Sequence, residues 1–147
     1  MIYLDNASTT KPSKEAAEAV MTACEIFGNP SSLHRLGLDA EKIITASKEA
    51  VAKVLGENKK NIYFTSGGTE SNNTAIFGAA HANKKRGRHL ITTKIEHPSV
   101  LEPFKLLEKE GFELTFLDAD EDGKISLEQF EKALRPDTVL VSVMAVN

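Results

Sequence analysis

The chain has 147 residues, 41% of them apolar and 27% charged, a composition typical of a folded domain with one core. Its 18 basic and 21 acidic residues give a net charge of −3, so the sequence provides no cationic field for nucleic acid. We expect no membrane span and no secretory signal, and the single cysteine excludes an internal disulfide, so we predict a cytoplasmic protein.

The hydrophobic periodicity predicts two helices before any strand. Apolar residues recur at steps of three and four over 13–27, and Gly28 follows as a stop signal. A longer amphipathic pattern fills 36–55 and ends at Gly56. Cys24 falls on the apolar face of the first helix, so we expect a buried, unreactive thiol rather than a nucleophile.

Beyond residue 61, short β-prone runs alternate with helical stretches. The predicted strands are 62–65, 90–93, 114–117 and 139–146, and the predicted helices between them are about 69–82, 99–109 and 127–134. Strands that alternate with helices of this length need crossover connections, which favour a parallel sheet with helices on its faces. The predicted fold class is therefore α/β, with N-terminal helices followed by a βαβαβαβ parallel sheet.

The last run, 139–146, contains no charge and no proline, as is typical of a strand buried on both faces of a parallel sheet. A strand this apolar needs neighbouring strands and covering helices, for which we find no further sequence. We therefore expect the 147 residues to be the first part of a larger fold. Within it we predict a helical segment at about 1–56 and a partial α/β domain at about 57–147.

A glycine-rich turn, Thr65-Ser66-Gly67-Gly68-Thr69, follows the first predicted strand. Small residues let backbone N–H groups approach an anion, the helix N-terminus adds partial positive charge, and the Thr69 hydroxyl can donate a hydrogen bond. The pattern is neither the Walker sequence nor GxGxxG, so it does not specify a nucleotide. Taken alone, it fits a phosphate-binding turn and a plain capped glycine turn about equally well.

Two further polar residues stand at predicted strand ends, where ligands of parallel sheets bind. His97 follows the strand at 90–93 and precedes Pro98, and its imidazole can stack on a flat ligand or move a proton. A lone histidine is more often a surface residue, but its place on the same rim as the glycine turn favours function. Asn147 ends the last run, where its amide either serves a ligand or is merely the final residue.

The acidic segment at 118–126 imitates the opening of a calcium loop, with acids at its first, third and fifth positions. The twelfth position is Gln129, which cannot supply the bidentate carboxylate, and a strand rather than a helix precedes the segment. Ser126 and Gln129 fit a helix capping box better. We predict no metal site, because no Cys, His and carboxylate cluster has metal-ligand spacing.

Five segments of the chain occur together in a recognisable order. They are YLDNASTT at 3–10, FGNPSSLH at 27–34, FTSGGTESN at 64–72, Glu96-His97, and LVSVMAVN at 140–147. In this combination they resemble the cysteine desulfurases of the NifS/IscS type, which belong to the class V aminotransferase group of pyridoxal phosphate (PLP) enzymes. The resemblance covers the whole chain but only the N-terminal part of a family member, somewhat more than its first third.

The resemblance implies roles for four residues. Gly68 and Thr69 would bind the PLP phosphate, and His97 would stack on the pyridine ring and assist proton transfer. Asn147 would be the first of an asparagine pair near the phenolic oxygen of the cofactor. The family converts L-cysteine to L-alanine, transfers sulfur as a persulfide to an acceptor or scaffold protein in iron–sulfur cluster assembly, and forms homodimers.

In this family the Schiff-base lysine and the persulfide cysteine lie beyond the position of Asn147. No lysine here occupies the family motif, and neither does Cys24, so we expect no catalytic residue in this chain and no activity without a complementary C-terminal chain. Whether the chain alone binds PLP stays open. The alternatives are a fragment of a selenocysteine lyase or another class V aminotransferase, and a non-catalytic module that pairs through 139–146.

Overall fold

The computed structural model describes residues 2–6 and 8–146, and the chain divides into two units, 1–64 and 65–147. In the first unit, α1 (Lys14–Cys24) and α2 (Arg35–Leu55) confirm the two predicted helices. Helix α1 begins after Ser13, whose Oγ accepts a hydrogen bond from a first-turn amide at 3.1 Å. Helix α2 ends at Gly56, whose φ of 67° is the left-handed cap that glycine favours.

The thiol of Cys24 is exposed, so the prediction of a buried core thiol is wrong. The periodicity placed Cys24 on an apolar face correctly, but α1 buries none of its residues in the described structure. Helix α2 buries Ala40 and Ala52 while Val54 remains 86% exposed. An apolar stripe in the sequence therefore shows which face can be buried, and not what covers it.

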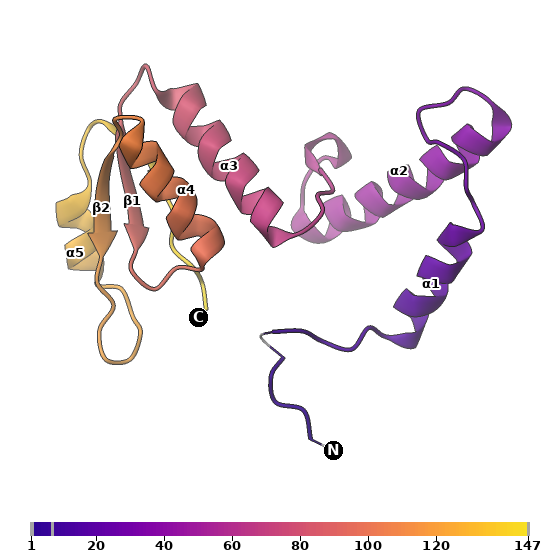
Figure 1. The fold of residues 1–147 in the computed structure, drawn as a ribbon, viewed down its shortest axis with the longest axis horizontal. Helices are drawn as coiled ribbons and strands as arrows, with labels where there is room; N and C mark the ends of the chain where they lie inside the picture. Colours follow the sequence, from indigo (N-terminus) through magenta and orange to yellow (C-terminus); the bar gives the residue numbers. More distant parts are fainter. Residues whose placement is uncertain (1, 7, 147) are drawn as a thin grey trace. The chain divides into compact units, whose positions relative to one another are not determined.

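The second unit is an α/β layer structure around a three-stranded parallel sheet (Figure 1). Its elements are α3 (Gly68–Asn83), β1 (His89–Thr93), α4 (Pro98–Lys109), β2 (Glu113–Leu117), α5 (Leu127–Ala133) and β3 (Thr138–Val141). The strand order is β2-β1-β3, with β1 in the centre. The alternation of strands and helices confirms the predicted α/β class.

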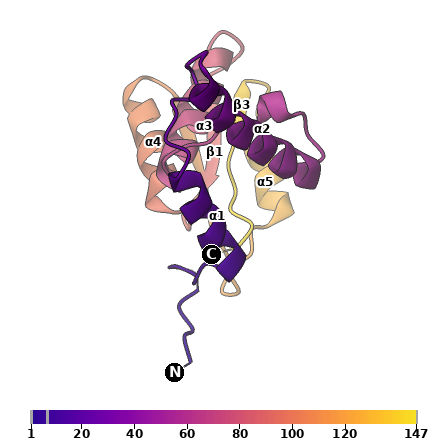
Figure 2. The ribbon, with the colours of Figure 1, turned by 90° about the vertical axis from the view of Figure 1, so that its right-hand side faces the viewer.

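Helices α3 and α4 pack side by side on one face of this sheet, and α5 lies on the other (Figures 1 and 2). The core lies between the sheet and the helix pair, where Leu90, Phe104 and Leu107 are completely buried. Each such side chain contributes roughly 1.5–3 kcal/mol through the apolar surface that it removes from water. This packing fixes the N-terminal turns of α3 and α4 relative to each other.

Two predicted strands differ in the structure. Residues 62–65 form no strand: they follow a short 3-10 turn, η1 (Lys59–Asn61), and Tyr63 is 79% exposed. An extended segment becomes a strand only beside a neighbour that shares its backbone hydrogen bonds, and the sheet of described residues consists of β2, β1 and β3 alone.

The predicted strand at 139–146 is shorter and more open than expected, because β3 spans Thr138–Val141 and is only partly buried. Within the described part of the chain it pairs with β1 along one edge, so it is an edge strand of this sheet and not one enclosed on both sides. Its parallel direction agrees with the prediction. Among the residues described, no helix has the length and apolar character needed to cross a bilayer.

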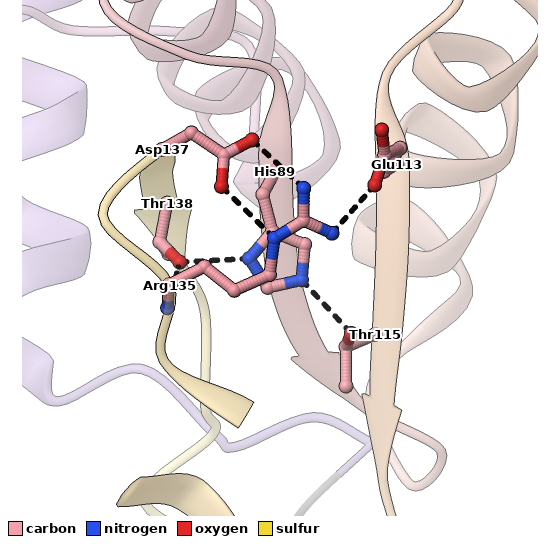
Figure 3. A network of polar contacts seen from close by, with 6 residues as sticks. All are labelled: His89, Glu113, Thr115, Arg135, Asp137 and Thr138. Carbon is pink, nitrogen blue, oxygen red and sulfur yellow. Dashed lines mark hydrogen bonds and ion pairs between the residues drawn. The ribbon is translucent and has the colours of Figure 1, made fainter. Parts of the chain in front are cut away.

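A buried histidine joins the three strands at their amino ends (Figure 3). His89 is fully buried in β1. Its Nδ1 lies 2.7 Å from Thr138 Oγ1 of β3, and its Nε2 lies 2.8 Å from Thr115 Oγ1 of β2. Burial, followed by the nearby Arg135 charge, lowers the pKa of His89. The neutral imidazole therefore links the three strands at their amino ends. Ligands of parallel sheets bind at the other edge, where the strands have their carboxyl ends.

Near this histidine, Arg135 links Glu113 at the start of β2 to Asp137, which precedes β3 (Figure 3). Its guanidinium lies 2.5 Å from a Glu113 carboxylate oxygen and makes two 2.9 Å hydrogen bonds to Asp137. The hydrogen bond from Arg135 lowers the pKa of the Asp137 carboxyl group. Because these side chains are partly solvent-exposed, we expect the ion pairs to orient the strand ends more than to stabilise them.

Candidate functional site

The segment that follows β3 is tied to the loop that follows β1, at the carboxyl edge of the sheet. The amide of Ser142 donates to the carbonyl of Ile91 at 2.9 Å. Glu96, only 7% exposed, accepts a 2.5 Å hydrogen bond from the amide of Met144 through its Oε1. The strand-end rule predicted that these segments converge, but it did not predict Glu96 as the residue that holds them together.

The glycine turn before α3 is held by its own hydrogen bonds. Glu70 Oε2 accepts from the Ser66 amide at 2.6 Å and from the Ser66 hydroxyl at 2.7 Å, and these two bonds lower the pKa of the Glu70 carboxyl group. Thr65 Oγ1 lies 3.1 Å from the Gly67 carbonyl oxygen and 2.7 Å from Ser71 Oγ. The turn therefore has a defined shape without any ligand.

The first turn of α3 is open on the side of Gly68 and Thr69. No side chain caps this helix, whose N-cap is Gly67. A Cβ atom added at Gly67 or Gly68 would meet no other group within 4 Å, so the approach to the backbone is unobstructed. Uncapped N–H groups at a helix N-terminus, together with about half a positive charge, make a suitable seat for an anion.

His97 is the N-cap of α4, with Pro98 in the first helical turn. Its Nδ1 accepts a 3.1 Å hydrogen bond from the Ser99 amide and lies 2.8 Å from Ser99 Oγ. Asn72, on α3, donates from Nδ2 to the same Ser99 Oγ at 2.8 Å. The sequence indicated His97 but not these two partners: Pro98 marks the helix start, whereas nothing local points from Ser99 to Asn72.

A hollow of about 370 Å³ lies between these two helices, from their N-terminal turns to the middle of α4, and we call it the α3–α4 hollow. It is lined by Thr69, Asn73, His97, Pro98, Ser99, Glu102, Pro103 and Leu106. Two of the predicted site residues, Thr69 and His97, thus border one space although they come from different helices. Gly68 precedes Thr69 at the start of α3 without lining the hollow, and Asn147 lies outside the described residues.

The acidic loop after β2 is organised by backbone contacts. Asp120 Oδ1 accepts from the amides of Asp122 at 3.0 Å and Lys124 at 2.8 Å, so this carboxylate shapes a turn. Ser126 Oγ accepts from the Gln129 amide at 3.3 Å, which confirms the predicted serine cap of α5. In the part of the chain that the structure describes, no group of three His, Cys, Asp or Glu residues has a metal-binding arrangement.

The chain is similar to proteins of one family over nearly its whole length. The family model of class-V aminotransferases matches residues 2–147. A "NifS/IcsS protein homolog" of Lactobacillus delbrueckii subsp. bulgaricus is 50% identical over 148 residues, which cover 100% of this chain and 38% of the relative. Cysteine desulfurase IscS of Dictyoglomus turgidum is 48% identical over 147 residues, covering 99% of this chain and 37% of that protein.

Solved structures agree with this similarity. A NifS-like protein matches with a TM-score of 0.92 at 40% identity, over 97% of this chain and 39% of that one. SspA in complex with cysteine matches with a TM-score of 0.88 at 38% identity, over 96% of this chain and 41% of that one. The chain thus spans about two fifths of the length of these relatives, in their N-terminal part, and it belongs to the class-V aminotransferase family.

Proposed function

We propose that this chain forms the phosphate-binding and ring-binding side of a PLP site in a cysteine desulfurase. The observation that carries the proposal is that Thr69 and His97 border the same α3–α4 hollow. The relatives named cysteine desulfurase and the similar protein solved with cysteine support L-cysteine as the substrate. The whole protein would convert it to L-alanine and pass sulfur on as a persulfide.

The residues present fit the phosphate group of PLP. The uncapped first turn of α3 offers N–H groups at Gly68 and Thr69, and the Thr69 hydroxyl has no partner within the described residues. The charge of Glu70 is engaged with Ser66. We propose that the turn binds the phosphate dianion by hydrogen bonds and by the helix dipole.

The residues also fit a flat aromatic ring. His97 is held at the lip of the hollow by hydrogen bonds through Nδ1 alone, which leaves the faces of its imidazole exposed. We propose that it stacks on the pyridine ring and fixes its orientation. When bound, PLP supplies the electron sink for chemistry at the substrate carbon.

We further propose that other polypeptide supplies the reacting groups. Among the described residues, no lysine or cysteine lines the α3–α4 hollow. PLP enzymes need a lysine for the aldehyde, and persulfide transfer needs a cysteine. This chain by itself is therefore expected to bind without turning over, and activity would require a complementary C-terminal chain within a homodimeric enzyme.

A phosphate-specific binding experiment tests the proposal. Pyridoxamine 5′-phosphate is the probe, because it lacks the aldehyde that reacts with surface lysines, and pyridoxamine without phosphate is its control. We expect Thr69→Ala to weaken binding of the phosphorylated probe about 10- to 100-fold, the range for a hydrogen bond to a charged group. Thr74→Ala, at an exposed position on the same helix, should bind like the parent chain.

Equal binding of the two probes, or equal affinity of the Thr69→Ala and Thr74→Ala variants for the phosphorylated one, would exclude the phosphate role. Because both probes carry the same ring, a dependence on the phosphate distinguishes a specific site from non-specific binding to exposed apolar surface. Because both threonines lie on α3, a general loss of helix stability should affect the two variants alike.

A second candidate function is an interaction module, and the edge position of β3 favours it. Among the residues that the structure describes, strand β3 pairs with β1 alone. An apolar hollow of about 300 Å³ lies beside it, lined by Leu117, Ile125, Ser126, Leu127, Phe130, Val141 and Val143. An added strand from a C-terminal chain would use this edge. Val141→Lys should abolish such a complex in size-exclusion chromatography, whereas unchanged complex formation would exclude pairing at this edge.

A further inference from the structure

The imidazole of His97 lies at the end of a hydrogen-bonded chain that begins on α3. Asn72 Nδ2 is 2.8 Å from Ser99 Oγ, which in turn is 2.8 Å from His97 Nδ1. Ser99 is 9% exposed and Asn72 is half-buried, so water competes little for these bonds. These hydrogen bonds connect α3 with α4, the two helices that border the α3–α4 hollow.

The direction of each hydrogen bond follows from one fixed donor. The Ser99 backbone N–H can only donate, and it donates to His97 Nδ1 at 3.1 Å, so Nδ1 carries a lone pair and no proton. The Ser99 hydroxyl beside the same Nδ1 must then donate as well. The Ser99 hydroxyl oxygen in turn accepts from the Asn72 side-chain amide, so the hydrogen in each of these three hydrogen bonds has a defined place.

With Nδ1 unprotonated, the neutral imidazole of His97 carries its hydrogen on Nε2. No other described residue forms a hydrogen bond to Nε2, whereas Nδ1 has two donors from Ser99. The ring therefore offers a hydrogen-bond donor, and not an acceptor, at its free nitrogen. Rotation of the ring about its Cβ–Cγ bond is also restrained, because it would move Nδ1 away from both Ser99 donors.

We propose that Ser99 and Asn72 are positioning residues that hold His97 as its Nε2–H tautomer and fix the plane of the ring. The inference deepens the proposed function: in the PLP site, His97 would meet the ligand as a stacked ring with a donor at Nε2. At its free nitrogen the neutral ring then donates a hydrogen bond to the ligand and does not accept one.

A simple capping role for Ser99 makes different predictions. The Ser99 backbone amide alone satisfies the cap, and any residue except proline supplies it. Under a capping role, the side chains of Ser99 and Asn72 would not influence the tautomer. Under our proposal the hydroxyl adds a second donor, and its direction depends on the amide of Asn72.

The test reads the ring nitrogens directly, by ¹⁵N NMR of the histidine side chains in the ligand-free 147-residue chain. The chain has 4 histidines, and a His97→Gln variant assigns the His97 signals by their loss. We expect one tautomer, protonated at Nε2, in the parent chain. Ser99→Ala should shift the tautomer ratio about five- to thirtyfold toward Nδ1–H, and Ser99→Thr should restore the parent ratio.

Asn72→Asp tests the proposal most strictly, because it reverses the direction of the hydrogen bond between residue 72 and the Ser99 hydroxyl. A carboxylate at position 72 accepts the Ser99 hydroxyl hydrogen, so the oxygen then presents a lone pair to Nδ1. We expect the His97 tautomer ratio to move toward Nδ1–H in this variant at least as far as in Ser99→Ala, because only the Ser99 backbone amide still donates to Nδ1. It should stay at the parent value in Asn72→Gln, which keeps an amide donor. Equal helix content by circular dichroism shows that the variants are folded.

A parent chain with Nδ1 protonated, or identical His97 signals in the parent, Ser99→Ala and Asn72→Asp chains, would overturn the inference. Because the tautomer is read without any ligand, its failure is separate from that of the proposed function. Loss of phosphate-dependent binding with an intact tautomer pattern overturns only the PLP role. A mixed tautomer with intact binding overturns only the positioning role of Ser99 and Asn72.

Discussion

Both units of the chain contain amphipathic helices, but they bury apolar side chains to very different degrees. In the unit at 65–147, Leu90 and Phe104 are completely enclosed between the sheet and its helices. In the unit at 1–64, the buried apolar residues of the described structure are Ala40, Ala52 and Ile62. Because burial of apolar area drives folding, the second unit should carry most of the stability of the chain.

We expect the largest effect from replacing one apolar side chain by alanine in each unit. Phe104→Ala removes a fully buried ring and should lower the free energy of unfolding by about 3–5 kcal/mol. Val54→Ala removes an exposed side chain from α2 and should change it by less than about 0.5 kcal/mol. Urea denaturation followed by circular dichroism measures both. Similar losses for the two variants would show that the first unit is buried to the same extent.

Acidification should have the next largest effect, and it should act on the second unit through His89. Burial and the Arg135 charge lower its folded-state pKa below that of an unfolded histidine, against the opposing charges of Asp137 and Glu113. The unfolded chain therefore binds the proton more readily, so stability from neutral His89 is complete above the unfolded pKa and is lost as pH falls through the folded-state value.

Urea denaturation of the parent chain from pH 7 downward measures this loss, and His89→Asn is the comparison because it cannot titrate. We expect the parent to lose stability more steeply than the variant below the ordinary histidine range. Parallel profiles for the two chains would show that His89 is not protonated on unfolding in this window. The two hydroxyl partners of His89 place this effect in the sheet itself.

The smallest effects concern two glycines, one in each unit. Gly56 caps α2 with a φ of 67°, so Gly56→Ala should cost about 1–2 kcal/mol. Gly78 lies within α3 with open space at its Cβ position, so Gly78→Ala should stabilise the chain by about 0.4–1 kcal/mol. Thermal unfolding compares them. A stabilising Gly56→Ala would mean that this cap is not formed in solution.

Local chemistry explains what could be predicted from the sequence. Ser13 and Gly56 mark helix ends because a cap is satisfied within a few residues. The strand at 62–65 could not be judged this way, because strand formation depends on a distant neighbour. The length of β3 was overestimated for the same reason, since an apolar run indicates the capacity for burial and not its extent.

The candidate site was predictable only in part. Thr69 and His97 stood out because each follows a predicted strand and because the chain resembles a known family. They border one hollow in the structure, and their binding roles stay predictions. The contacts of Ser99 with Asn72 and of Glu96 with Met144 were not predicted, because each joins residues far apart in the sequence without a local signal.

NMR mapping of pyridoxamine 5′-phosphate on the 147-residue chain shows directly whether α3 and α4 share one binding site. If Thr69 and His97 border one binding site, the amide signals of Gly68 and Thr69 and the ring signals of His97 should shift together and saturate at one ligand concentration. The phosphate should be required for the shifts at α3. Shifts at only one of the two helices, or saturation at clearly different concentrations, would contradict the account.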